Sequence, residues 1–167
     1  MRILTLALVV LLVAACGGTP EGGGEGQSES PDADLTAQEQ AAVYQAVMGD
    51  TVDSPWISDE VCAKAQASPG SDTGPCEPMD PEVRAALAEA IPGASFTSDP
   101  DEVQDRLFER GGGVIWFLGP IEGEGDEVKV PASYYCGGLC AGGTVHLMEL
   151  VDGEWIETGS EGPTWMS

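Results

Sequence analysis

Three consecutive glycines, 111–113, divide the chain into two parts with different hydrophobic patterns. Before them, apolar residues recur at the spacing of a helix, whereas after them they run together or alternate, as they do in strands. Helical and strand patterns that are segregated along a chain are typical of the α+β class. We therefore expect one globular α+β domain over residues 36–167, in which N-terminal helices cover one face of a C-terminal antiparallel β-meander.

Three helices are predicted before the glycines. Thr36–Glu39 is a capping-box sequence and opens a helix that runs to about Met48. Asp80-Pro81 opens a second helix, because proline suits the first helical position, and its apolar stripe comprises Val83, Ala86, Leu87, Ala90 and Ile91. A short third helix begins near residue 99 and carries Val103, Leu107 and Phe108. Two shorter runs, 55–58 and 94–97, have strand character.

The strands after the glycines differ in pattern. Val114–Leu118 is continuously apolar, which predicts a strand buried on both faces. Val128–Tyr135 alternates, and its Pro131 indicates an edge strand or a bulge. The last two strands, 144–151 and 154–158, flank Asp152-Gly153, which predicts a type I′ hairpin with Leu150 facing Trp155.

The first residues predict export. Arg2 precedes an apolar run over residues 3–15, which is too short for a membrane-spanning helix of about 20 residues. Its length is that of a signal-peptide core. Residues 17–35 then consist mainly of Gly, Ser, Pro and acidic residues, so we expect a disordered acidic tether that spans roughly 25 Å.

The run ends in Val13-Ala14-Ala15-Cys16, which resembles the lipobox of bacterial lipoproteins. The resemblance implies that residues 1–15 are removed as a signal peptide and that the thiol of Cys16 carries diacylglycerol, with fatty acyl chains such as palmitate. Acyl chains would then anchor the protein on the extracytoplasmic face of the cell membrane. The alternative is an ordinary secretory signal with an incidental cysteine.

Four further cysteines are present: Cys62, Cys76, Cys136 and Cys140. In an exported chain they are expected to form disulfides. Three pairings are possible, and proximity in the sequence favours Cys62–Cys76 and Cys136–Cys140. The competing interpretations are a redox-active pair and a zinc site made of the four cysteines or including His146, but the spacings fit neither a Cys-x-x-Cys motif nor two short ligand pairs.

The formal net charge of −23 excludes classes of partner. Five scattered basic residues remain once residues 1–15 are removed, too few for nucleic acid or for a basic lipid-binding face. The sequence also lacks the motif of a nucleophilic hydrolase, since His146 is the only histidine and no nucleophile elbow accompanies it. No cofactor or metal motif is present: the glycines at 111–113 lack the lysine and helix of a phosphate loop, and the acidic residues Asp99, Asp101, Glu102 and Asp105 lack the ligand spacing of an EF-hand.

The C-terminal third resembles small exported bacterial proteins of uncharacterised activity. The similarity covers residues 114–167 and rests on Ser133–Gly143, on the Asp152–Trp155 hairpin and on the closing segment Pro163–Ser167. Ala141 departs from the pattern, in which glycine is usual. The resemblance implies an exported protein and no particular activity.

These observations lead to three hypotheses. The first is a non-enzymatic, lipid-anchored module that binds an envelope protein, a cell-wall component or a small ligand, with Tyr134, Tyr135 and Trp165 as candidate contact residues. The second is a cell-envelope hydrolase that uses carboxylates and His146. The third is a structural or inhibitory module whose loop at 136–140 presents a rigid turn to a partner.

Overall fold

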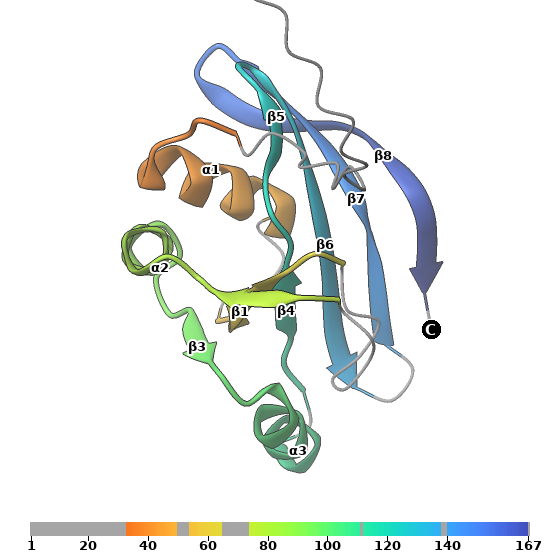
Figure 1. Ribbon diagram of the computed structural model, residues 1–167. Coiled ribbons are helices and arrows are strands. Elements are labelled where there is room, and N and C mark those ends of the chain that lie inside the picture. The colour runs from red at the N-terminus through yellow and green to blue at the C-terminus, as the bar shows by residue number, and fades with distance from the viewer. Residues whose placement is uncertain (1–32, 50–53, 65–73, 111, 138–139, 167) are drawn as a thin grey trace, which may run out of the picture.

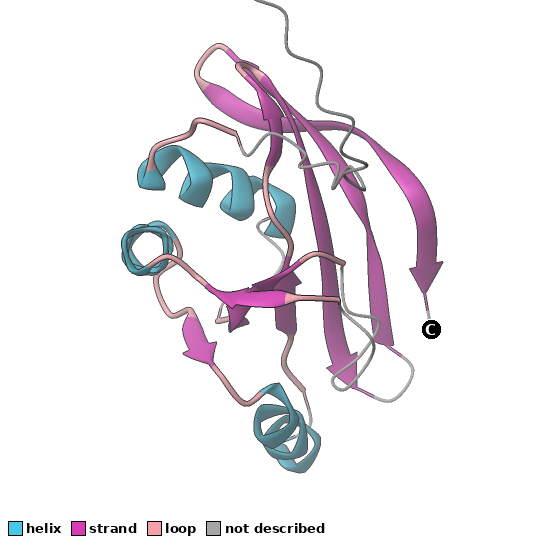
Figure 2. Ribbon diagram, in the orientation of Figure 1, coloured by secondary structure: helices cyan, strands magenta, loops and turns pink. Residues whose placement is uncertain are grey.

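The computed structural model describes residues 33–49, 54–64, 74–110, 112–137 and 140–166 (Figure 1). They form three helices and one mixed sheet of eight strands, which confirms the α+β class (Figure 2). The helices are α1 (Ala37–Met48), α2 (Pro81–Ala90) and α3 (Pro100–Arg110). The strands are β1 (Trp56–Cys62), β2 (Cys76–Pro78), β3 (Ser95–Thr97), β4 (Ile115–Leu118), β5 (Glu122–Glu124), β6 (Glu127–Gly137), β7 (Cys140–Val151) and β8 (Glu154–Met166).

The first two helices begin where their caps predict. The side chain of Thr36 accepts the N–H of Glu39, and the Glu39 carboxylate accepts the Thr36 N–H at 2.8 Å, so the capping box is closed. Hydrogen bonds from the Thr36 hydroxyl and then from its N–H lower the pKa of Glu39, because they stabilise the ionised carboxylate. Asp80 caps α2 by accepting the N–H groups of Glu82 and Val83.

The sheet is not the pure C-terminal meander that the sequence predicted. Its strand order is β2-β1-β4-β6-β7-β8, with β3 also paired to β1 and β5 also paired to β6. Strands β1, β2 and β3 come from the N-terminal half, and β1 runs parallel to β3 and β4. The buried strand β4 needs a hydrogen-bonded neighbour on each edge. Strand β6 is one of these neighbours and β1 is the other, with Ile57 of β1 opposite Trp116.

The helices also lie on both faces of the sheet, and the prediction that they cover one face was wrong. Trp116 and Leu118 point into the larger core cluster, which includes buried residues of α1 and α2. Ile115 and Phe117 point the opposite way and pack against Val103 of α3. A strand that is apolar at every position requires cover on both sides, and α3 supplies the second side.

Pro131 lies in the interior strand β6, at a bulge. Residues 119–121, which separate β4 from β5, stand opposite only two residues of β6. The carbonyl of Pro131 accepts the N–H of Gly119 at 2.6 Å. Because the N–H and C=O of one residue in an antiparallel strand point to the same side, the donor that proline lacks faces this irregular stretch.

The predicted hairpin is confirmed. Leu150 lies opposite Trp155, and Asp152 and Gly153 have φ values of 53° and 87°, as both central residues of a type I′ turn require. The pairing continues beyond the predicted end of the second strand, to Met166.

Candidate binding surface

Among the described residues, the face of the sheet that carries α3 is covered by a helix at one end only. There, Val103 and Leu107 of α3 pack on four side chains of the sheet: Ile115, Phe117, Tyr135 and Ala141. At the other end the same face holds a hollow of about 540 Å³ between β5, β6, β7 and β8. We call this region the open sheet end and define it by six of its lining residues: Glu122, Glu127, Lys129, Leu147, Glu149 and Glu161.

Strand register orders these side chains in rows. Glu124, Glu127 and Glu149 lie side by side on β5, β6 and β7 and are all exposed. In the next row Lys129 lies between Glu122 and Leu147. Directly opposed side chains of neighbouring strands are about 5 Å apart, so the first row places like charges in contact range.

An ion pair crosses the hollow. The Lys129 Nζ lies 2.5 Å from Glu161 Oε1, and each side chain keeps nearly half of its surface exposed. Lys129 is on β6 and Glu161 on β8, so the lysine side chain reaches across β7. Val145 and Leu147 of β7 are the partners of these positions in the register, and they form an apolar floor under the ion pair.

Two exposed apolar residues extend this floor. Ile156, on β8, is 43% exposed and lies opposite Glu149. Val151, which is 38% exposed, follows Leu147 and Glu149 on the same face of β7. The surface therefore combines partly exposed aliphatic groups with four carboxylates and one ammonium group. Such a surface favours cationic ligands with apolar parts and repels anions.

The two tyrosines proposed as contact residues are packed into the molecule. Tyr134 lies on the face of α1 and α2, where its ring is 5.4 Å from that of Trp116. A Cβ on Gly142 would come within 2.9 Å of the Tyr134 hydroxyl, so glycine is needed beneath the ring. Tyr135 is 8% exposed on the other face, and its hydroxyl accepts a hydrogen bond from Gln104.

The third proposed contact residue, Trp165, lies in the backbone of β8 opposite Gly143, and its side chain is outside the described part. The proposed lipidation site, Cys16, also lies outside the described residues. In the described part, no helix is long and apolar enough to cross a membrane.

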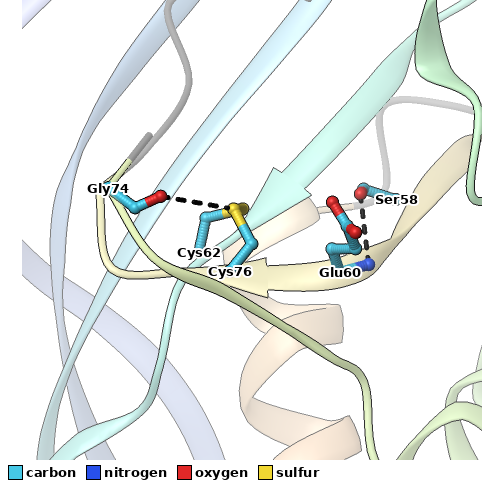
Figure 3. Close-up of a disulfide and its surroundings, with 5 residues drawn as sticks. All are labelled: Ser58, Glu60, Cys62, Gly74 and Cys76. Atoms are coloured by element: carbon cyan, nitrogen blue, oxygen red, sulfur yellow. Dashed lines mark hydrogen bonds between the residues drawn. A yellow bond between two sulfur atoms is a disulfide. The ribbon is translucent and has the colours of Figure 1, made fainter. Parts of the chain in front are cut away.

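Both favoured disulfides are present. Cys62 and Cys76 lie directly opposite each other on β1 and β2, with Cα atoms 4.1 Å apart (Figure 3). Cys136 and Cys140 join the ends of β6 and β7, with Cα atoms 5.1 Å apart. Among the described residues, one group has the spacing of metal ligands: Glu60, Cys62 and Cys76. The two cysteine sulfurs of this group are already bonded to each other in the disulfide.

His146 lies on the face that α1 and α2 cover, opposite Val130, and its side chain is 14% exposed. Its Nδ1 is 3.1 Å from Glu157 Oε1, but the contact does not have hydrogen-bond geometry. Ser160 stands opposite His146 in the register. No hydrogen bond between Ser160 and His146 is found among the described residues.

The open sheet end was missed by the sequence interpretation. The signal was present in the alternation of β6, where exposed Glu127 and Lys129 alternate with buried Val128 and Val130. On β7, however, apolar residues fall on both faces, so the sequence did not indicate which face is left partly exposed. Comparison of the chain with known family models, characterised proteins and solved structures gives no match.

Proposed function

We propose that this chain is a lipid-anchored, extracytoplasmic bacterial lipoprotein that works as a non-enzymatic binding module. The observation that carries the proposal is the open sheet end, where partly exposed Leu147 lies among four carboxylates in a hollow of about 540 Å³, and partly exposed Val145 lies next to Leu147 on the same face of β7. Contiguous apolar surface with a charged margin is characteristic of binding sites. The lipobox resemblance at Cys16 supports the anchor, and the two disulfides are typical of exported domains.

The anchor is tested on the native protein. Mass spectrometry should find an N-terminal Cys16 that carries diacylglycerol, and Cys16→Ser should release the protein from the membrane fraction. A chain that still begins at Met1, or an unmodified Cys16, would overturn the anchor and leave the binding function to be tested separately.

Binding is tested in cells with a photo-crosslinking amino acid. Placed at Leu147 in the open sheet end, it should give a defined adduct with one partner; placed at Ala85, which is exposed on α2, it should not. Adducts that form equally from both positions, or from neither, would contradict a binding role for this surface.

A second candidate function is a cell-envelope hydrolase that uses carboxylates and His146, whose Nδ1 lies 3.1 Å from Glu157 Oε1 and which stands opposite Ser160 in the strand register. A histidine beside a carboxylate and a hydroxyl is the arrangement of nucleophilic hydrolases. A fluorophosphonate probe should then label Ser160, and both Ser160→Ala and His146→Gln should abolish labelling. An unlabelled native chain would eliminate this candidate.

A further inference from the structure

We propose that the open sheet end docks an extended segment of a partner protein in which lysine or arginine alternates with apolar residues. In this proposal Lys129 is an internal competitor, which the segment displaces from Glu161. The inference rests on the proposed function, because it names the partner of the surface assigned there to binding.

The charge of the surface selects the partner. Glu122, Glu127, Glu149 and Glu161 surround one ammonium group, that of Lys129. Glu127 and Glu149 lie directly opposite each other on β6 and β7. Like charges in such a pair destabilise a sheet. A cationic side chain placed over this row removes the repulsion, so the bound state gains an interaction that the free protein lacks.

The apolar residues of this surface indicate that the partner carries apolar side chains as well as positive charge. Val145 and Leu147 are half-buried, and Ile156 and Val151 are exposed beside the acidic row. A metal ion or a simple polyamine would leave these apolar groups in water. A peptide whose side chains alternate between cationic and apolar would cover the floor and meet the carboxylates together.

Other occupants lack the complementary charge. Residues 17–35 of this chain contain five acidic residues and no basic ones, so the chain's own N-terminal segment would be repelled. A second copy would present a domain that carries 24 acidic and 5 basic residues over 36–167. Anionic lipid headgroups are excluded for the same reason.

Lys129 is well placed to yield to such a partner. In its ion pair with Glu161, each of the two side chains is about half exposed to water. Breaking the pair therefore costs little free energy. Arg106 and Glu102 on α3 form an ion pair of similar exposure, which provides a matched control away from the surface.

The experiment measures binding of a fluorescent nine-residue peptide, in which lysine alternates with leucine or threonine, to the purified full chain by anisotropy. Glu127→Lys with Glu149→Lys should weaken binding at least tenfold. Glu77→Lys with Glu89→Lys changes the net charge equally at exposed positions on β2 and α2 and should weaken it less than threefold. The double reversal leaves two like charges opposed, as in the native protein. We therefore expect the variant to fold, and thermal unfolding checks this.

Lys129→Gln gives a prediction of opposite sign. It should tighten binding of the same peptide at least threefold, whereas Arg106→Gln should leave it unchanged. Equal effects of each variant and its control would mean that the peptide responds to overall charge only, and the proposal would fail. Equally tight binding of a peptide with serine in place of leucine would overturn the apolar part.

Failure here can be distinguished from failure of the proposed function. If the peptide does not discriminate but the crosslink at Leu147 still forms, the surface binds a partner that is not basic. If neither is observed, the surface has no binding role.

Discussion

The two faces of the sheet use the same strands but are completed differently. On the face of α1 and α2, Val128, Val130 and Met148 are at most 2% exposed and contribute to one continuous core. On the opposite face, their neighbours Lys129 and Glu149 are exposed. One face is sufficient to hold the open sheet end in place, so the exposed side chains on the other face are under weaker packing constraints.

The largest expected difference between the faces is in the cost of removing a leucine. Leu118→Ala, in the core beneath α1 and α2, should lower the free energy of unfolding by about 2–5 kcal/mol, because it leaves a cavity. Leu147→Ala, at the open sheet end, should cost about 1 kcal/mol or less. Urea unfolding of both variants measures this difference, and equal losses would mean that the open sheet end is packed interior.

A smaller effect of opposite sign is expected from the acidic row. Glu149→Gln removes one of two opposed carboxylates and should raise the free energy of unfolding by about 0.2–1 kcal/mol. Glu77→Gln is the control, since Glu77 is an exposed strand residue that lies opposite the apolar Val61. If Glu149→Gln destabilised the protein, the row would be a stabilising feature and the argument from repulsion would be wrong.

The smallest effect concerns a carboxylate that stabilises the fold. The pKa of Glu39 is lowered from 4.5 by its hydrogen bonds to Thr36, so its contribution to stability is present above pH 4.5 and is lost as the pH falls through the lowered pKa. The difference in Tm between the wild type and Glu39→Gln should therefore be largest near neutral pH and shrink below pH 4.5. A difference that stays constant down to pH 2.5 would contradict this account.

Local features of the fold were predictable from the sequence. The caps at Thr36 and Asp80 and the turn at Asp152-Gly153 each depend on residues within a few positions of one another. The disulfide partners Cys62 and Cys76 were also favoured by their closeness in the chain. In all these cases, a short segment carries the physical cause of its own structure.

What could not be predicted depends on contacts between distant segments. The run at 55–58 has strand character, but nothing in it indicates parallel pairing with β4, almost sixty residues away. The apolar run at 115–118 predicted burial on both faces without indicating that α3 covers the second one. The open sheet end was hidden for the same reason, because it exists only where no described helix packs on the sheet.

The backbone contact between Ala33 and Ile121 has a consequence for how a partner is met. The N–H of Ala33 donates to the carbonyl of Ile121, which is adjacent in sequence to Glu122 of the open sheet end. The chain that leads back to Cys16 therefore joins the domain beside this surface. With an anchor at Cys16 and a span of roughly 25 Å, encounters would be confined to a thin layer above the bilayer. A partner held in the same layer would reach a high local concentration, so weak affinity would suffice for occupancy.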